Sequence, residues 1–208
     1  MNRRDIIKGL GLTFGYAVAA PSVLSILESC STKKEDLWEA VFLNGNEKHY
    51  ISHLVDIILP ATDTPGGLDV NLPQFIDMMS HDMLRSEEQV IFKDGSLVFA
   101  QRFKDKFNKD IGESNRDELA ELFANYFDLE PDVQSKVLTR QRKELDKIEL
   151  SEMDDYKMYS CLIQIRKLSL FGYFTSEKIG REVLNFDPIP GSYDPCIPVA
   201  DIGNAWTI

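Results

Sequence analysis

The sequence predicts an all-α fold: a single compact helical domain of about six to seven helices, followed by an irregular Pro/Gly-rich C-terminal tail. Between residues 46 and 184, apolar side chains recur three and four positions apart, which is the spacing of one helical face. No run of alternating apolar and polar residues rivals these segments, so no strand is predicted. After Phe186 the spacing is lost and prolines and glycines become frequent, which indicates irregular backbone.

The first half of the domain is expected to contain three helices. Asn46 is a residue type that caps helices, and Pro60 cannot continue one, so the first helix is predicted between them. Residues 60–74 form a loop rich in proline and glycine, and Pro73 suits the first turn of the second helix. The third helix is predicted from near residue 95 to residue 109.

The second half is expected to contain three more long helices and a short one. They are predicted over residues 114–127, 131–145, 151–172 and 176–184. Ser114 and Asn115 resemble the start of a capping box, and Ser151 and Asp154 can cap the longest helix. Gly172 is predicted to end that helix, because glycine readily adopts the left-handed conformation of a C-terminal cap.

The first thirty residues have the parts of an export signal. Arg3 and Arg4 open a charged head, residues 9–27 are uncharged, and Cys30 follows a small residue. The paired arginines resemble a twin-arginine signal, and the ending resembles that of a lipoprotein with Cys30 as the lipidated residue. An ordinary secretory signal and a retained membrane anchor remain alternatives.

These features predict three parts in the chain. They are an export signal over residues 1–29, a polar tether over 30–44 and a helical domain over 45–208. The mature protein is expected on the periplasmic side of a bacterial membrane, held by lipid on Cys30. The formal net charge of −11 at pH 7 argues against direct binding to nucleic acid or anionic lipid. Cys161 and Cys196 would lie in an oxidising compartment, and the sequence allows either a disulfide between them or two free thiols.

The chain lacks the motifs that commonly mark a catalytic or cofactor site. It has no glycine-rich nucleotide fingerprint after a predicted strand, no Cys-x-x-Cys-His haem motif and no Gly-x-Ser-x-Gly elbow. His49 and His53 share a helical face, a spacing found in zinc sites, but Tyr50 stands where a metalloprotease has glutamate. We therefore expect no catalytic residue, metal or cofactor in this chain, and a small metal enzyme is the lesser alternative.

Two parts of the sequence resemble a known family. Residues 57–67, Ile-Ile-Leu-Pro-Ala-Thr-Asp-Thr-Pro-Gly-Gly, and residues 72–76, Leu-Pro-Gln-Phe-Ile, are similar to the opening motif of the gluconate 2-dehydrogenase subunit 3 (gamma subunit) family. Residues 170–177, Leu-Phe-Gly-Tyr-Phe-Thr-Ser-Glu, and residues 186–193, Phe-Asp-Pro-Ile-Pro-Gly-Ser-Tyr, are similar to its closing motif. The resemblance marks the following residues as structural or as partner contacts: Pro60, Thr62, Asp63, Thr64, Pro65, Gly66, Gly172, Tyr173, Phe174, Thr175, Pro188, Pro190 and Gly191.

The resemblance implies a non-catalytic small subunit of a membrane-associated, flavin-dependent dehydrogenase of sugars, sugar acids or alcohols. Its expected partner is a glucose-methanol-choline-type flavoprotein that carries FAD, and a cytochrome c often accepts the electrons in such complexes. The small subunit is expected to assist maturation of the flavoprotein and its export in folded form. An autonomous exported binding lipoprotein without an enzyme partner is the alternative.

The first motif also has a purely structural interpretation. Asp63 and Thr64 can accept hydrogen bonds from neighbouring backbone N–H groups, and Pro65 favours a turn at Gly66. An accessory subunit should nevertheless expose an apolar patch when it is alone. We expect that patch in the apolar-rich tail, residues 189–208.

Overall fold

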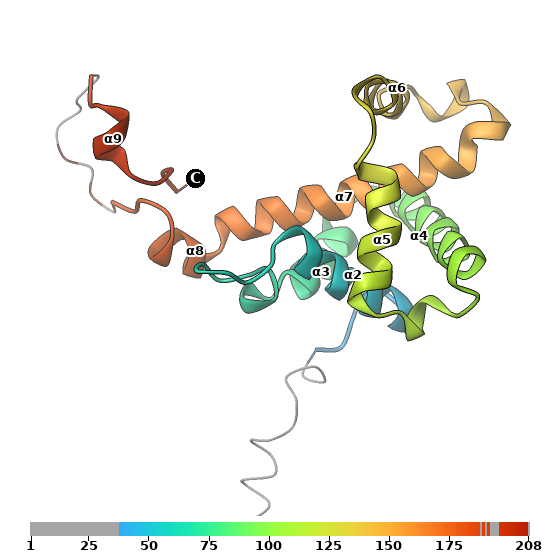
Figure 1. Ribbon diagram of the computed structural model, residues 1–208, viewed down its shortest axis with the longest axis horizontal. Helices are drawn as coiled ribbons and strands as arrows, with labels where there is room; N and C mark the ends of the chain where they lie inside the picture. Colours follow the sequence, from blue (N-terminus) through green and yellow to red (C-terminus); the bar gives the residue numbers. More distant parts are fainter. Residues whose placement is uncertain (1–37, 188, 190, 192–195, 208) are drawn as a thin grey trace, which may run out of the picture. The chain divides into compact units, whose positions relative to one another are not determined.

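The computed structural model describes residues 38–187, 189, 191 and 196–207 (Figure 1). The predicted export residues Arg3 and Arg4, the lipidation residue Cys30, and Pro188 and Pro190 of the second motif lie outside the described residues. The chain divides after Glu39 into two units, and the account below concerns the second, which contains the helices.

The described part of the chain is all-α, as predicted, with eight α-helices and no strand. The α-helices are α2 (Gly45–Ile58), α3 (Leu72–Asp82), α4 (Ser86–Phe107), α5 (Arg116–Phe127), α6 (Pro131–Gln141), α7 (Met153–Thr175), α8 (Glu177–Glu182) and α9 (Val199–Ile202). Between them lie the 3₁₀ turns η2 (Leu68–Val70), η3 (Ile111–Glu113), η4 (Leu145–Lys147) and η5 (Leu150–Glu152). None of the described helices combines the length and the apolar character needed to cross a lipid bilayer.

Helix α7 is the central element of the core. It packs along α4 and α3 and also contacts α2, α6 and α8 (Figure 1). Its buried residues are Tyr156, Met158, Tyr159, Cys161, Leu162, Ile165, Leu168, Ser169, Gly172 and Tyr173. These residues are not confined to one face, because a helix that is covered on several sides needs apolar residues around most of its circumference.

Helices α4 and α7 make a close contact at Gly95. A Cβ atom added to Gly95 would lie 2.1 Å from the carbonyl oxygen of Lys157 and 2.8 Å from the Cβ of Cys161. Only glycine therefore fits between the two backbones. The prediction that a helix begins near residue 95 was wrong, because α4 begins at Ser86 and Gly95 lies in its interior. Gly95 therefore allows close packing of two helices and does not mark the end of one.

Asparagine caps the N-termini of α2 and α5. The Asn44 side chain accepts from the Glu47 N–H at 2.9 Å, and the Glu47 carboxylate accepts from the Asn44 N–H at 2.8 Å. This reciprocal pair is a capping box. Asn115 and Glu118 form the same pair at α5, which confirms the predicted start of that helix. The predicted cap Asn46 was wrong, since Asn46 lies inside α2.

Both predicted ends of α7 differ from the structure. The helix begins at Met153, directly after η5, and its N-cap residue Glu152 makes no side-chain capping bond, so Ser151 and Asp154 are not caps. The helix continues through Gly172 to Thr175. Gly172 does not end it, because this glycine is a packing position between α7 and α3, as described below.

The C-terminal tail is tied back to the chain at Asn185. The Asn185 N–H donates to the carbonyl of Ala205 at 2.8 Å, and the Thr207 N–H donates to the carbonyl of Asn185 at 3.1 Å. The Asn185 side-chain amide also donates to the carbonyl of Ile202 at 2.6 Å. Within residues 189–208, where the sequence led us to expect an apolar patch, the exposed large apolar side chains of the described part are Ile189, Ile197, Val199 and Trp206.

Candidate functional site

The described residues of the opening motif meet the first part of the closing motif in the folded chain. We call the contact between residues 60–76 and residues 170–177 the motif junction. The hydroxyl of Tyr173 donates to the carbonyl of Pro65 at 2.7 Å, although the two residues are 108 positions apart in the sequence. Packing between α3 and α7 extends this contact. The two stretches that carry the family resemblance therefore build one structural unit.

The loop between α2 and α3 folds tightly around two glycines. A Cβ atom on Gly66 would lie 2.6 Å from the backbone nitrogen of Ala61 and 3.0 Å from the carbonyl oxygen of Leu59. A Cβ atom on Gly67 would lie 2.6 Å from a methyl carbon of Val55. The Gly67 N–H donates to the Leu59 carbonyl at 2.8 Å and closes the loop. Both glycines are thus required by close approach.

Asp69, and not the predicted Asp63 or Thr64, holds this loop in place through a side-chain hydrogen bond. The Asp69 carboxylate, in η2, accepts from the Gly66 N–H at 2.8 Å. Asp63 is exposed, and no backbone hydrogen bond to its side chain is found among the described residues. The expectation that Asp63 bonds the neighbouring backbone was therefore wrong, because the stabilising carboxylate follows the turn and does not lie at its tip.

Gly172 allows α7 to pack directly against α3. A Cβ atom on Gly172 would lie 2.6 Å from a ring carbon of Phe75 and 2.9 Å from a methyl carbon of Leu72. The ring of Phe75 also lies beside that of Phe171, with 6.2 Å between the ring centroids. Phe171 and Phe174 nevertheless remain 49% and 40% exposed. The junction therefore has a packed interior and an aromatic surface.

The remaining motif residues divide between local structure and open surface. Thr175 donates from its hydroxyl to the Phe171 carbonyl at 2.7 Å, one helical turn earlier. Among the individual residues that the resemblance marks, the exposed ones are Pro60, Thr62, Asp63, Thr64, Phe174, Thr175 and Gly191. Exposure at these positions is compatible with partner contact, whereas Gly66, Gly172 and Tyr173 are buried and build the junction.

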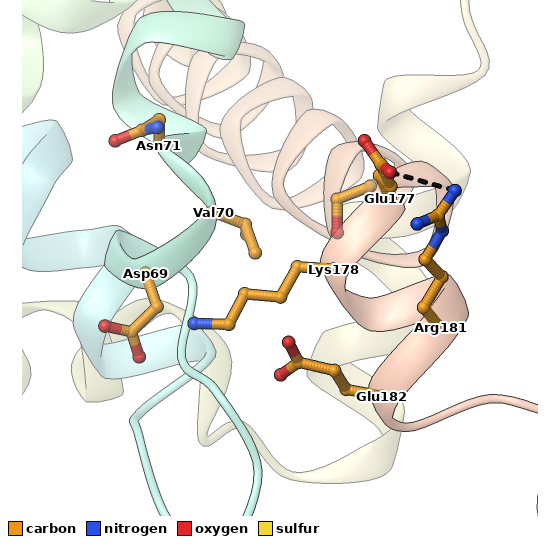
Figure 2. A pocket seen from close by; sticks show the side chains of 8 residues that line it. Asp69, Val70, Asn71, Glu177, Lys178, Arg181 and Glu182 are labelled. Carbon is orange, nitrogen blue, oxygen red and sulfur yellow. Dashed lines mark ion pairs between the residues drawn. The ribbon is translucent and has the colours of Figure 1, made fainter.

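An open recess lies beside the motif junction, between η2 and α8 (Figure 2). It is lined by Asp69, Val70, Asn71, Ser176, Glu177, Lys178, Arg181 and Glu182. Glu177 and Arg181 form an ion pair at 3.2 Å. The Lys178 ammonium extends between Asp69 and Glu182 in Figure 2. Charges of both signs in an open recess suit polar contacts with a protein partner better than enclosure of a small molecule.

The two histidines of α2, His49 and His53, make contacts within the fold. The Nε2 of His49 lies 2.9 Å from the carbonyl oxygen of Ser114. Because a carbonyl oxygen can only accept, this nitrogen carries the proton and donates, so it is not free to bind a metal ion. The ring of His53 packs edge-on against that of His49, with centroids 4.8 Å apart. Among the described residues, no group of three or more His, Cys, Asp or Glu side chains is arranged to hold a metal ion.

No disulfide joins Cys161 and Cys196 in the structure, so of the two alternatives the disulfide is not formed. Cys161 is buried in the core of α7, whereas Cys196 is exposed in the tail. Burial raises the pKa of the Cys161 thiol far above its ordinary value. A buried thiol that keeps its proton is a poor nucleophile, so Cys161 has the properties of a core residue.

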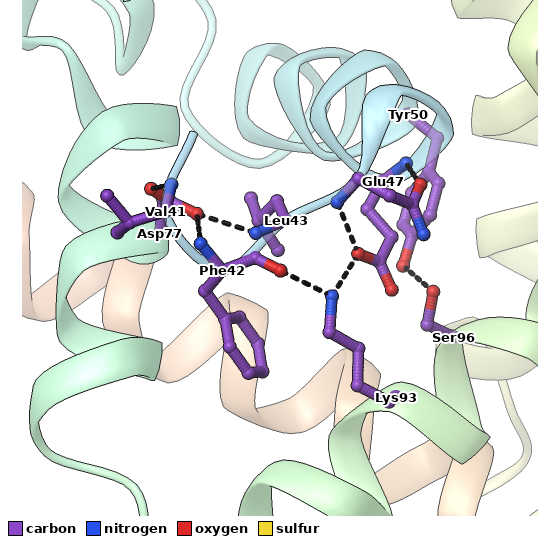
Figure 3. A network of polar contacts seen from close by, with 9 residues as sticks. Val41, Phe42, Leu43, Glu47, Tyr50, Asp77, Lys93 and Ser96 are labelled. Atoms are coloured by element: carbon purple, nitrogen blue, oxygen red, sulfur yellow. Dashed lines mark hydrogen bonds and ion pairs between the residues drawn. The ribbon is translucent and has the colours of Figure 1, made fainter. Parts of the chain in front are cut away.

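The sequence interpretation missed a polar network that fixes the segment before α2 (Figure 3). The buried Asp77 carboxylate accepts from three successive backbone N–H groups, those of Val41 at 2.8 Å, Phe42 at 2.9 Å and Leu43 at 2.7 Å. We call this arrangement the Asp77 clamp. The position of Asp77 between Ile76 and Met78 in an apolar helix could have revealed it, because a buried carboxylate needs hydrogen-bond donors.

A lysine strengthens the hold on the same segment. The Lys93 ammonium donates to the Phe42 carbonyl at 2.6 Å and forms an ion pair with the buried Glu47 (Figure 3). It also lies 4.2 Å from the centroid of the Phe42 ring. The hydroxyl of Tyr50 donates to Ser96 at 3.0 Å in the adjoining core. These groups bond one another and the backbone, so they stabilise the connection between the N-terminal segment and the helices.

The comparisons with known proteins agree with the resemblance of the motifs. The model of the family described as gluconate 2-dehydrogenase subunit 3 matches residues 46–191, which is more than half of the chain. The match runs from α2 into the tail and includes both sides of the motif junction. No curated protein and no solved structure matches the chain. The family match is sufficient to conclude that the chain belongs to the gluconate 2-dehydrogenase subunit 3 family.

Proposed function

We propose that this chain is the non-catalytic small subunit of a flavin-dependent dehydrogenase and that it binds the large subunit, which carries FAD. The observation that carries the proposal is the family match over residues 46–191, because the family is named for a subunit of gluconate 2-dehydrogenase. The partner is a glucose-methanol-choline-type flavoprotein that oxidises a sugar, sugar acid or alcohol, and a cytochrome c is the expected electron acceptor.

The contacts of the reactive side chains support a binding role over a catalytic one. His49 donates to a backbone carbonyl, the Cys161 thiol is buried, and Asp77 bonds three backbone N–H groups. Each of these groups is used by the fold. Several large apolar side chains remain exposed on helices instead, among them Met78, Phe171 and Phe174. Exposed apolar surface on a folded domain is typical of a subunit that is complete only with its partner.

We further propose that the chain assists maturation of the large subunit and accompanies it through the exporter for folded proteins. The paired Arg3 and Arg4 support this route, and Cys30 would then hold the complex on the periplasmic side of the membrane. A large subunit without an export signal of its own would depend on this chain for its passage.

The test is expression of the large flavoprotein subunit with and without this chain. With the chain present, we expect more FAD-loaded large subunit outside the cytoplasm, measured by flavin absorbance and by reduction of an electron-accepting dye. The double variant Arg3→Lys/Arg4→Lys should leave the complex in the cytoplasm, which separates the export role from the binding role. If the flavoprotein matures, leaves the cytoplasm and turns over equally well without this chain, the proposal is wrong.

A further inference from the structure

Four apolar side chains, three of them exposed and Phe75 half-buried, lie along the contact between α3 and α7. Phe75 and Met78 are three residues apart on α3, and Phe171 and Phe174 are three residues apart on α7, so each pair shares a helical face. The rings of Phe75 and Phe171 join the two pairs, with 6.2 Å between their centroids. Met78 is 50% exposed. We call this surface, formed by Phe75, Met78, Phe171 and Phe174, the α3–α7 face.

The α3–α7 face is rigid, because the two helices that carry it are in close contact. Gly172 lies directly against Phe75 and Leu72, and the Tyr173 hydroxyl bonds the first motif loop. Rigid aromatic side chains lose little conformational entropy on binding and are enriched at the energetic centres of interfaces. The apolar side chains of the tail, such as Ile189 and Val199, lie outside the long helices. The α3–α7 face is therefore the better preorganised of the two surfaces.

Two lysines flank this face without an ion-pair partner in the described part of the chain. Lys167 precedes Phe171 by one turn of α7, and Lys178 lies in α8, where it lines the recess beside the motif junction. Glu88, which Lys167 attracts from a longer distance, is itself bonded to Arg85 at 3.1 Å. Lys167 is exposed and places a positive charge at the edge of the face, in a chain whose net charge is −11. Such a face is complementary to an apolar patch with carboxylates at its rim.

We propose that the α3–α7 face binds the large catalytic subunit, through an apolar patch on that subunit that is rimmed by acidic side chains. This inference rests on the proposed function, because it names the surface through which the accessory subunit acts. Four side chains form the centre of such an interface and not all of it, since a stable complex buries about 800 Å² on each partner. The polar recess between η2 and α8 lies beside the junction and carries charges of both signs, so the positive charge that favours an acidic rim comes from Lys167.

A competition experiment tests the face even if the large subunit needs this chain in order to mature. The large subunit is expressed together with wild-type chain and one variant chain at equal levels, each with its own tag. The large subunit is then purified, and the ratio of variant to wild-type chain bound to it is measured by mass spectrometry. The face variant is Met78→Ser/Phe174→Ser, and the matched control is Val90→Ser/Leu97→Ser on α4, whose side chains are 60% and 66% exposed.

The face variant should be bound at least about 10-fold less than wild type, because truncation of an apolar residue at the centre of an interface commonly has that effect. The control variant should be bound as well as wild type. Lys167→Glu should also be bound less, and salt should reduce its difference from wild type, whereas Lys136→Glu on α6 should have no effect. Circular dichroism should give the same helix content for all variants, since the altered side chains are exposed.

The outcomes separate this inference from the proposed function. If wild-type chain does not bind the large subunit, the proposed function fails. If wild type binds and the face variant binds equally well, the face is wrong and the function stands. The face is also wrong if truncation after Val199 removes binding while Met78→Ser/Phe174→Ser does not. Capture of a second copy of this chain, lost only in the face variant, would show a homodimer contact and overturn the inference.

Discussion

Replacement of Gly95 by alanine should destabilise the fold through the α4–α7 contact. The new Cβ atom would lie 2.1 Å from the Lys157 carbonyl oxygen, so the backbones must separate by roughly 1 Å to reach an ordinary contact distance. Overpacking of this kind costs about 3 kcal/mol at the upper end of the usual range. Alanine regains about 1 kcal/mol through its higher helix propensity. The net loss in the free energy of unfolding is therefore about 2 kcal/mol.

Thermal unfolding followed by circular dichroism measures this loss. For a domain of this size, a loss of 2 kcal/mol corresponds to a fall in Tm of about 4–8 °C. Gly45→Ala is the matched control, because no atom lies within 4 Å of the added Cβ and its Tm should be unchanged or slightly higher. Gly172→Ala should give an intermediate fall, since its nearest atom belongs to a side chain and is 2.6 Å away, whereas Gly95 meets a backbone carbonyl at 2.1 Å. Equal Tm values for Gly95→Ala and Gly45→Ala would refute the reasoning.

Three further predictions concern the Asp77 clamp, the thiols and the N-terminus. Asp77→Ala removes the charged acceptor of one buried and two partly buried N–H groups, so urea unfolding should show a loss in the free energy of unfolding of about 3 kcal/mol; an unchanged midpoint would contradict the clamp. In the native protein at pH 8, iodoacetamide should label Cys196 and not Cys161, because burial raises the pKa of the Cys161 thiol and shields it from the reagent. Equal labelling of both cysteines, measured by mass spectrometry, would contradict the burial of Cys161. Without the large subunit, Cys30→Ala should move the mature domain from the membrane to the soluble periplasmic fraction, whereas continued sedimentation with membranes would indicate a retained anchor.

The helices could be predicted from the sequence because apolar spacing is a property of each helix alone. The ranges predicted for α2 and α5, and the predicted start of α3, agree with the structure to within a few residues. The first cap was misplaced because Asn44 and Asn46 are both suitable residue types. Glu47, three residues after Asn44, distinguishes them, since the capping box needs both partners. That signal was present in the sequence.

The roles of two glycines could not be predicted from the residues next to them in the sequence. Gly95 and Gly172 were interpreted as helix boundaries, whereas each lies inside a helix and touches another. Glycine is favoured both at helix ends and where backbones approach, and only the partner helix decides between these roles. The α3–α7 face was missed for the same reason. Phe171 has the residue type of a core position, but it is 49% exposed and lies beside the Phe75 ring.

The bond between Tyr173 and Pro65 has a consequence for synthesis of the chain on the ribosome. Its partners are 108 residues apart, whereas the Asp77 clamp joins residues at most 36 apart. At a usual synthesis rate of about 5–20 residues per second, the loop at Pro65 emerges roughly 5–20 s before Tyr173. During that interval α3 can fold, and its Asp77 can bind residues 41–43. The helix α7, which packs against α3 and contributes half of the α3–α7 face, is still missing. A chain whose synthesis stops before α7 therefore cannot present the α3–α7 face, and the binding that we propose for this face can begin only after α7 has been synthesised.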